Sequence, residues 1–375
     1  MGYMDLVYQN SRNRRKFCAY YLVFHKYKFA DARHPTHNLS VRPTECIITG
    51  LSPLDYKYKV IIMNLLTLPS QLPIARYRFT FQPDTELVLP PYAASTLRGV
   101  FGHALLNTVC TCWEPSQDGV HPADCPYSHI FATPYNDKLP GSRKHHPPQP
   151  YVIETPFKQQ LQIYPAGSDY QFQIVLTGGA RHMLPLIKAV FEYAFKKGIA
   201  RQNVRCSLKN LEVETPDGWQ GILEHGMIPL HPNTISLPQY FPSDVSIQLL
   251  TPLTIRYDKK VMKAEQLTES MFLRQAIRDI SAIATTHWEH PLEGRFQELI
   301  RATELVRGRK SLSDTKWKRH SNRQQRDMTY QGVIGEWAFY DLPTELSALL
   351  YIGQWLHIGK ETTFGHGGYR ITAGL

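Results

Sequence analysis

Three histidines have the residue type and the setting for proton transfer at a phosphate ester. His103 lies in the stretch GVFGHALL, while His357 and His366 lie in the glycine-rich stretch HIGKETTFGHGGYRI near the C-terminus. Reaction at a phosphate ester needs a base at the attacking oxygen, an acid at the leaving oxygen and positive charge at the phosphorane. Histidine suits both proton-transfer roles near neutral pH. His103, His357 and His366 are therefore candidates for a general acid or base.

Two side chains near His103 would complete such a site. Tyr92 would position the phosphate, and Arg98, on the same predicted helix as His103, would stabilise negative charge. The alternative makes Tyr92 and Arg98 ordinary surface or packing residues. His103 has apolar neighbours such as Phe101 and Leu105. It is therefore also compatible with a helix histidine that faces a cleft between domains, or with a hydrogen-bonded core group.

The glycine-rich stretch is a candidate for holding a phosphate through its backbone. It matches neither the G-x-x-x-x-G-K-[ST] nucleotide-binding loop nor the G-x-G-x-x-G pattern. Glycines adopt positive φ and let backbone amides approach a phosphate closely, while nearby cations add charge. The alternative is a loop whose glycines only turn the chain from a helix into a strand. The predicted contacts to nucleic acid are Gly359, Lys360, Gly365, His366, Gly367, Gly368 and Arg370.

A second candidate interface is the basic run TKWKRHSNRQQRD at residues 315–327. Residues 301–330 carry nine Lys and Arg against three acidic residues, and the whole chain has a net charge of +10. This charge favours a polyanionic partner such as RNA or DNA, with cations on phosphates and an aromatic platform for a base. The alternative is a solvated loop or an edge strand. The predicted contacts are Trp317, Arg319, Arg323 and Arg326.

A cysteine-rich segment between residues 110 and 125 is a candidate zinc site. Its ligands would be Cys110, Cys112 and Cys125 together with His121 or His129. Zinc takes four thiolate or imidazole ligands in structural sites, but the C-x-C-x₁₂-C spacing departs from the usual C-x₂-C pairs. Structural cysteines in a loop are the alternative.

Composition bounds the class of protein. The chain has 375 residues, 42% hydrophobic and 20% charged, which is typical of a globular protein long enough for two domains. No apolar run approaches the roughly 18 residues that span a bilayer, and no apolar segment of a signal peptide follows the basic start. Six cysteines are too few for a disulfide scaffold. We therefore expect a cytoplasmic protein with no membrane partner.

The elements that must position these residues repeat once along the chain. The first half predicts strand, helix, irregular segment, strand, helix and strand, with Gly198 ending the second helix. The second half repeats this order, with Thr268 capping one helix and Pro343 opening another. Both halves read approximately β-α-β-β-α-β, the ferredoxin-like pattern. The predicted elements are strands at 74–81, 170–178, 204–214, 246–257 and 333–340, helices at 92–108 and 185–197, and an irregular segment at 110–150.

The sequence therefore predicts an α+β protein with tandem ferredoxin-like (RRM-like) domains and a Cys/His-containing insertion in the first. The start of the chain shows no sustained period and is basic, which suggests a poorly ordered extension without much function, with Met63 as an alternative start. A basic arm that binds nucleic acid is the alternative. The predicted divisions are 1–72 for the extension, 73–232 for the first domain, 233–243 for a linker and 244–375 for the second domain.

The order of these motifs resembles the CRISPR-associated RAMP endoribonucleases that process precursor repeat RNA, the Cas-six family. The resemblance covers most of the chain from residue 74 onward. Members often keep a catalytic histidine in or beside the helix that holds His103, although their catalytic residues vary and some lack it. In the family, the loop after the last helix lies along the RNA. The motifs that carry the resemblance are LRGVFGHAL at 97–105, CPYSHIF at 125–131, the W-x-R-x-S-x-R-Q run at 317–324 and HIGKETTFGHGGYRI at 357–371.

The resemblance implies an endoribonuclease that binds CRISPR repeat RNA and cuts the precursor into guide RNAs. It implies cleavage without a metal or other cofactor, leaving a 2′,3′-cyclic phosphate and a 5′-hydroxyl, so that zinc would serve structure alone. Other Cas proteins of an effector complex are the further partners it suggests. Two alternatives remain open, namely a non-catalytic RAMP subunit that binds guide RNA and a nucleic-acid-binding protein unrelated to CRISPR.

Overall fold

The computed structural model describes most of the chain from residue 64 onward. The predictions for residues 1–63, including a start at Met63, lie outside the described residues. In the described part of the chain, no helix is both long and apolar enough to cross a membrane. The described residues are 64–110, 121–122, 125–134, 147–158, 160–321 and 326–374.

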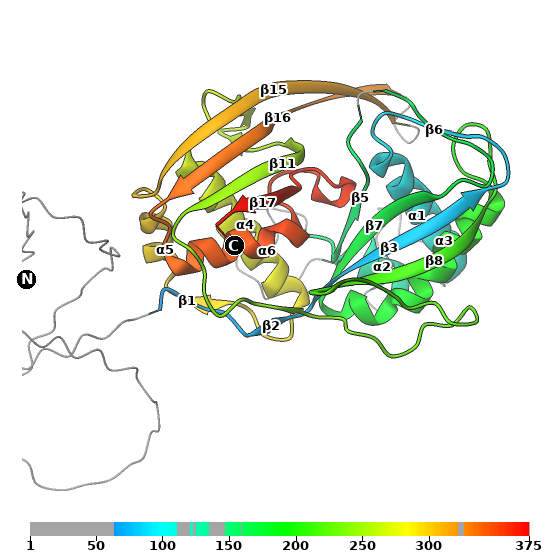
Figure 1. The fold of residues 1–375 in the computed structure, drawn as a ribbon, viewed down its shortest axis with the longest axis horizontal. Coiled ribbons are helices and arrows are strands. Elements are labelled where there is room, and N and C mark those ends of the chain that lie inside the picture. Colours follow the sequence, from blue (N-terminus) through cyan, green and yellow to red (C-terminus); the bar gives the residue numbers. More distant parts are fainter. Residues whose placement is uncertain are drawn as a thin grey trace, which may run out of the picture. The chain divides into compact units, whose positions relative to one another are not determined.

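The first domain is an antiparallel sheet with helices on one face (Figure 1). Alternate side chains of its central strand β3, among them Tyr77, Phe79 and Phe81, are fully buried against these helices, as the two-residue period of a strand requires. The strand order is β5-β7-β3-β8-β9. The elements are β3 (Ile74–Pro83), β4 (Leu87–Leu89), α1 (Ala94–Val109), α2 (Pro126–Ile130), β5 (Tyr151–Glu154), β6 (Gln162–Tyr164), β7 (Tyr170–Thr177), η2 (Gly178–Met183), α3 (Leu184–Lys197), β8 (Cys206–Thr215) and β9 (Gly218–Gly221).

The second domain has a four-stranded antiparallel sheet in the order β15-β16-β11-β17. Thr268 caps the start of helix α4, as predicted, and its hydroxyl accepts the Met271 amide at 3.2 Å. Helix α6 follows Pro343 and buries Leu346, Leu349 and other residues of the predicted stripe. The elements are β11 (Val245–Leu253), β12 (Arg256–Tyr257), β13 (Lys260–Val261), α4 (Glu269–His287), β14 (Glu293–Gly294), α5 (Phe296–Ala302), β15 (Arg307–Ser321), β16 (Arg326–Tyr340), α6 (Thr344–Leu356), η3 (Thr362–Phe364) and β17 (Tyr369–Ala373).

Both sheets have the same topology, which confirms the predicted fold class. In each, a β-α-β-β-α-β unit places its first and third strands at the centre and its second and fourth strands outside them, the ferredoxin-like arrangement. The insertion with Cys110 and Cys125 lies between α1 and β5. Strand β9 extends the first sheet beyond this unit.

The segments before and between the domains are tied to the second domain. Strand β1 (Leu66–Thr67) pairs with β14, and β2 (Gln71–Leu72) pairs with β10 (Ile235–Ser236). Leu66 and Leu72 are buried in the second core. The part of the predicted extension after residue 64 therefore belongs to the folded protein, because its apolar side chains complete that core.

The outer face of the first sheet helps to join the two domains. Ile74 on β3, Val152 on β5 and Val175 on β7 are buried with the core of the second domain rather than with their own. The long β15-β16 hairpin extends from the second sheet toward the first domain (Figure 1). The outer face of the first sheet therefore packs on the second domain, and the hairpin of the second domain extends toward the first.

Candidate functional site

Helix α1 presents Arg98 and His103 in different directions. Five helical positions separate them, which is a rotation of about 140°. The Arg98 guanidinium lies between two rings, 4.4 Å from the centroid of Phe131 and 4.5 Å from that of Phe364. His103 is exposed and has no hydrogen bond or ring contact within the described residues. Arg98 therefore connects α1 to the second domain, and His103 faces solvent.

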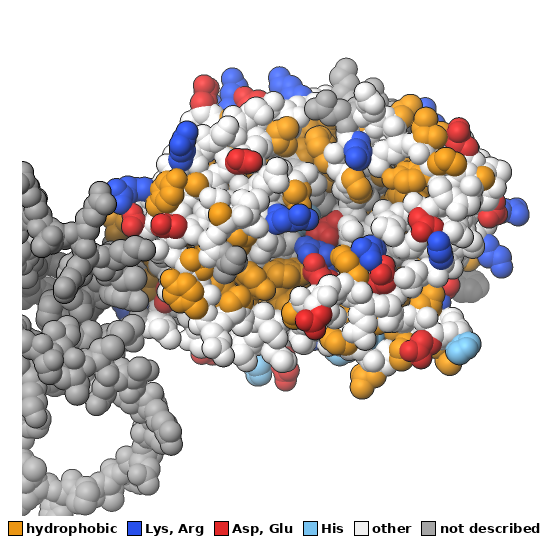
Figure 2. Space-filling model, viewed as in Figure 1, with side chains coloured by type: hydrophobic (Ala, Val, Ile, Leu, Met, Phe, Trp, Pro, Cys, Tyr) orange, Lys and Arg blue, Asp and Glu red, His pale blue; other side chains and the backbone are white. Residues whose placement is uncertain are grey.

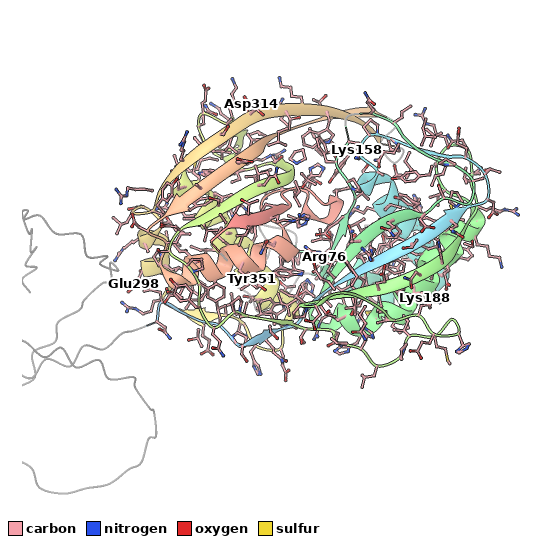
Figure 3. All side chains as sticks on the ribbon, in the orientation of Figure 1. Arg76, Lys158, Lys188, Glu298, Asp314 and Tyr351 are labelled. Carbon is pink, nitrogen blue, oxygen red and sulfur yellow. The ribbon has the colours of Figure 1, made fainter. Side chains whose placement is uncertain are left out.

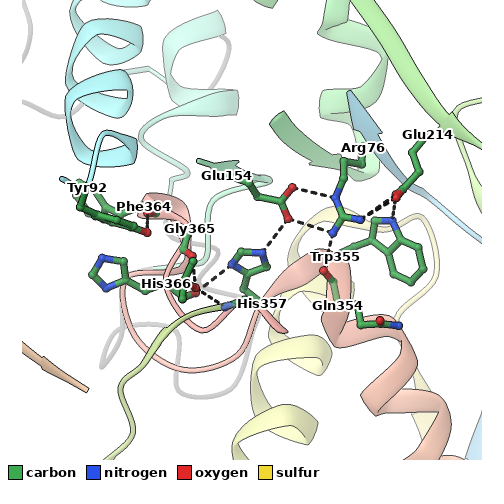
Figure 4. Close-up of polar contacts among 12 residues, drawn as sticks. Arg76, Tyr92, Glu154, Glu214, Gln354, Trp355, His357, Phe364, Gly365 and His366 are labelled. Atoms are coloured by element: carbon green, nitrogen blue, oxygen red, sulfur yellow. Dashed lines mark hydrogen bonds and ion pairs between the residues drawn. The ribbon is translucent and has the colours of Figure 1, made fainter. Parts of the chain in front are cut away.

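Tyr92 holds the glycine-rich loop against the first domain. Its hydroxyl donates a hydrogen bond to the Phe364 carbonyl (Figure 4), and its ring packs edge-on against His366 at 4.8 Å. Tyr92 is buried, and this burial raises the pKa of its hydroxyl well above the ordinary value. The predicted role of positioning a phosphate would require this hydroxyl to leave its carbonyl partner.

Two aromatic rings of the β15-β16 hairpin cover the glycine-rich loop. Trp317 on β15 stacks on Tyr330 of β16 at 5.6 Å and meets His366 edge-on at 4.9 Å. It also contacts Phe157 of the first domain at 6.2 Å. The structure therefore brings Trp317 together with His366 and Tyr92, three residues that the sequence placed in separate candidate sites.

The amides of the glycine-rich loop are used inside the protein. The Gly365 amide donates to Thr362, that of Gly367 to Pro252 at 2.9 Å, and that of Gly368 to the Thr251 hydroxyl at 2.8 Å. The loop is thus no open cradle of amides for a phosphate. Contact between this loop and RNA stays a prediction, and its exposed cations are Lys360 and Arg370.

Two glycines of this loop are required for close packing. Gly367 has a φ of +69°, and a β-carbon there would lie 1.8 Å from the Ile358 carbonyl oxygen. Gly365 has a φ of +76°, and a β-carbon would lie 2.4 Å from the carbonyl oxygen of Ile153 in the first domain. Only glycine fits these two positions, so the turn alternative from the sequence accounts for them.

His357 is buried between the domains. Its Nε2 lies 2.9 Å from the Glu154 carboxylate on β5, and its Nδ1 lies 3.1 Å from the His366 carbonyl oxygen (Figure 4). Both ring nitrogens face oxygen atoms, so both hydrogen bonds form only when the ring is protonated. His357 is 3% exposed, which leaves a substrate no direct access to it. Its geometry suits a structural role better than proton transfer to RNA. We call the contacts of Arg76, Glu154 and His357 between the two domains the interdomain joint.

Arg76 stands at the centre of this joint (Figures 3 and 4). Its guanidinium contacts Glu154 at 2.9 Å and Glu214 at 2.9 Å, and it donates to the Gln354 carbonyl of the second domain at 2.6 Å. It also lies 5.4 Å from the Trp355 ring centroid. Two carboxylates of the first domain are thus tied to the end of α6 by one cation.

The neighbours of the Glu154 carboxyl shift its pKa. Burial alone would raise its pKa, because it disfavours the charged form. The positive charge of Arg76 and the hydrogen bond from His357 outweigh burial, so the pKa lies below the ordinary value. Glu154 is therefore held as a carboxylate between the Arg76 guanidinium and the His357 ring.

Asp279 on α4 fixes the start of the glycine-rich loop. One of its oxygens accepts the Gly359 amide at 2.8 Å and the other accepts the Gln275 side-chain amide at 2.6 Å. Burial raises its pKa from 3.8 to about 6, against the effect of these hydrogen bonds. A carboxylate that protonates more easily in the folded than in the unfolded chain costs stability once the pH exceeds its unfolded pKa.

The Asp279→Asn variant is expected to gain stability relative to wild type as the pH rises. Below about pH 4 the aspartate is neutral in both the folded and the unfolded chain, as asparagine is, so the gap between the two free energies of unfolding is smallest there. Between pH 4 and about 6 that gap should grow by about 1–2 kcal/mol, discounted because a fifth of the side chain is exposed. Urea unfolding at several pH values measures this. Asp217→Asn, at an exposed turn, should show no such growth, and a flat gap for Asp279→Asn would contradict the assignment.

Three of the predicted zinc ligands lie together. Cys110, His121 and Cys125 place their ligand atoms within 4.8 Å of one another. Cys112 lies outside the described residues. His129, the alternative to His121, is exposed on α2 and is not part of this group.

The predicted basic contacts remain largely untested by the geometry. The side chains of Arg319, Arg323 and Arg326 lie outside the described residues. Figure 2 shows Lys and Arg side chains interspersed with acidic ones on the face it draws. Arg309 and Lys316 are exposed cations on β15, one strand of the hairpin. The basic run begins within β15, which is the edge strand of the second sheet. This agrees with the edge-strand alternative for the start of the run.

Family models match both domains. A model described as an N-terminal domain matches residues 72–235, and a model described as the CRISPR-associated endoribonuclease Cas6 matches residues 247–369. No curated protein matches the chain in sequence.

Solved structures match across both domains at low identity. A partial Cas6-RT-Cas1–Cas2 complex is 14% identical, with a TM-score of 0.50 over 81% of this chain, which spans only 47% of the matched chain. A Cas6 product complex is 12% identical over 80% of this chain and 98% of the other, with a TM-score of 0.49. Cas6 of Thermus thermophilus is 13% identical over 81% and 99%, with a TM-score of 0.45.

The sequence of the second domain thus matches one family model, and the described chain has the tandem ferredoxin-like fold. Of the motifs that carry the resemblance, the run at 317–324 and most of 357–371 lie within the residues matched by the Cas6 model, while those at 97–105 and 125–131 lie outside them. The second domain, over residues 247–369, is similar in sequence to the CRISPR-associated endoribonuclease Cas6.

Proposed function

We propose that this protein is an endoribonuclease that binds CRISPR repeat RNA and cuts the precursor transcript into guide RNAs. The observation that carries the proposal is the match of residues 247–369 to the endoribonuclease Cas6 model. The net charge of +10 supports a polyanionic substrate.

The proposed reaction is attack of a 2′-hydroxyl on the adjacent phosphorus. The P–O2′ bond forms as the P–O5′ bond breaks, leaving a 2′,3′-cyclic phosphate and a 5′-hydroxyl. No water or metal enters this balance, because the proton lost from O2′ equals the proton gained by O5′. His103 is the proposed proton donor or acceptor, since it is exposed while His357 and His366 are buried.

The proposed RNA path runs along the exposed cations near the loop and hairpin. Lys360 and Arg370 flank the glycine-rich loop, and Arg309 and Lys316 lie on β15. Each cation on a phosphate strengthens binding by releasing counterions, which makes affinity depend on salt. Trp317 is half-buried against Tyr330, so a base would stack only on its remaining exposed edge.

Other Cas proteins are proposed as partners. The solved structure that matches with a TM-score of 0.50 is named as a partial Cas6-RT-Cas1–Cas2 complex. This chain spans less than half of that chain, so any shared assembly is part of the proposal.

Cleavage of labelled repeat RNA in EDTA tests the proposal. The RNA is the repeat of the CRISPR array from the source genome, and the expected product is one discrete fragment ending in a 2′,3′-cyclic phosphate. The matched control carries a single 2′-deoxynucleotide at the cut, which removes the nucleophile and should bind without being cut. A scrambled RNA of equal length controls for sequence.

The outcomes separate the functions. Tight binding of the repeat without any cut would replace the proposal with a guide-RNA-binding subunit. Equal binding of repeat and scrambled RNA, again without a cut, would leave only a general nucleic-acid-binding protein. Cutting that stops in EDTA and returns with added magnesium would overturn the metal-independent reaction.

A further inference from the structure

Three ligand atoms converge at the end of α1. Cys110 follows the last residue of α1, Cys125 immediately precedes α2, and His121 lies between them in the chain. The Cys110 sulfur lies 3.3 Å from His121 Nδ1 and 3.8 Å from the Cys125 sulfur, which is 3.9 Å from the same nitrogen. Each of the three atoms thus has the other two as neighbours.

These spacings are those of ligands around one metal ion. Tetrahedral zinc holds thiolate sulfurs at about 2.3 Å and imidazole nitrogens at about 2.0 Å, so two sulfurs lie about 3.8 Å apart and a sulfur and a nitrogen about 3.6 Å apart. The sulfur pair matches at 3.8 Å, and the two sulfur–nitrogen distances, 3.3 and 3.9 Å, bracket the second value.

Two simpler explanations fit less well. A disulfide requires a sulfur–sulfur distance of about 2.05 Å, and the Cys110 and Cys125 sulfurs lie 3.8 Å apart. A single thiol–imidazole hydrogen bond explains the contact between Cys110 and His121. It does not explain why the buried Cys125 thiol approaches both partners as well.

We propose that Cys110, His121 and Cys125 bind a structural zinc ion in the first domain. Two thiolates and one imidazole are soft to borderline donors, which select zinc over magnesium or calcium. The fourth position is open to water or to a further protein ligand. The site is separate from the residues proposed for cleavage, since none of its three ligands is among them.

The ion would hold α2 in place beside α1. Phe131, directly after α2, packs against Gly102 of α1 so closely that a β-carbon on Gly102 would lie 2.3 Å from its ring. The same Phe131 ring covers the Arg98 guanidinium at 4.4 Å. Loss of zinc would therefore loosen α2 and expose Arg98, which lies against Phe364 of the glycine-rich loop.

Zinc content of the full-length protein, purified under reducing conditions, tests the site. We expect about one zinc per chain, and at least about a tenfold lower content in Cys110→Ser, His121→Asn and Cys125→Ser. Cys206→Ser and His129→Asn are matched controls, since Cys206 is a buried free thiol elsewhere in the domain and His129 is exposed on α2. Both controls should keep their zinc.

Cobalt substitution keeps the test independent of whether the variants fold. Wild-type protein reconstituted with Co²⁺ should show the visible absorption of a tetrahedral ion and the near-ultraviolet charge transfer of a thiolate ligand. Two outcomes would overturn the site, namely reduced, folded wild-type protein that binds neither ion, or zinc retained in full by the Cys110→Ser and Cys125→Ser variants. Quantitative thiol titration that finds a Cys110–Cys125 disulfide in the native protein would also overturn it.

Discussion

Replacing Arg76 with methionine is expected to lower the free energy of unfolding by about 3–5 kcal/mol. The change leaves Glu154 and Glu214, which are 16% and 30% exposed, without the cation that both contact. It also removes the hydrogen bond to the Gln354 carbonyl on α6. Methionine keeps most of the side-chain volume, so the loss reports charge and hydrogen bonding rather than a cavity. Chemical denaturation of the full-length protein measures it.

Arg78→Met is the matched control on the same strand. Arg78 pairs with Glu212 through two contacts of 2.7 Å and lies 4.3 Å from the Trp219 ring centroid, all within the first domain. Only one carboxylate loses its partner there, so we expect a smaller loss of about 1–2 kcal/mol. The pair of variants separates an arginine that joins the domains from one that serves its own sheet.

Hydrogen exchange locates the effect. Arg76→Met should speed exchange at the end of α6 and in the glycine-rich loop, because Gln354 loses its hydrogen bond to Arg76 and Glu154, the partner of His357, loses its cation. Arg78→Met should leave these amides unchanged. Equal exchange in both variants, or a loss below about 1 kcal/mol for Arg76→Met, would show that the joint contributes little.

Much of the fold follows from local sequence patterns. The alternation in IARYRFTF marks β3, and the stripe of Phe272, Ala276 and Ile280 marks α4, because each pattern reflects one buried face. The caps at Thr268 and Gly198 are equally local. Strand β5, only four residues long after a segment rich in proline, carries no such pattern. It forms because its neighbour β7 supplies the pairing.

The candidate site was less accessible to sequence reasoning. The cysteine group could be proposed from spacing, since its members lie within sixteen residues. The joint of Arg76, Glu154 and His357 could not, because 78 to 278 residues separate the bonded partners. One sign of these contacts was visible in the sequence, namely Arg76 on the polar face of β3. An arginine in that position is usually expected to be exposed. The glycine-rich loop was correctly placed between helix and strand, but only the fold showed that its amides are already bonded.

Replacing His103 with alanine is expected to slow repeat cleavage by about 100- to 10,000-fold, with RNA affinity unchanged within about twofold. The side chain is exposed and has no polar or ring contact in the part of α1 that the structure describes. Its loss should therefore change the free energy of unfolding by no more than about 0.5 kcal/mol. Single-turnover cleavage and filter binding measure rate and affinity separately.

Two other histidines serve as controls. His129→Ala removes an exposed histidine from α2 and should cleave at the wild-type rate. His357→Gln removes a buried histidine that contacts Glu154 at 2.9 Å, so it should lose stability first, and activity only in proportion to the unfolded fraction. A His103→Ala enzyme that cuts at the wild-type rate would remove this residue from the mechanism.

A substrate with sulfur in place of the leaving 5′-oxygen distinguishes the two roles open to His103. A thiolate leaves without being protonated, so a general acid becomes unnecessary while a general base does not. If His103 is the acid, the His103→Ala variant should cut this substrate at nearly the wild-type rate. If it is the base, the variant should stay slow on both substrates. Because binding, folding and the metal site are the same in the two assays, the comparison isolates one proton at one oxygen.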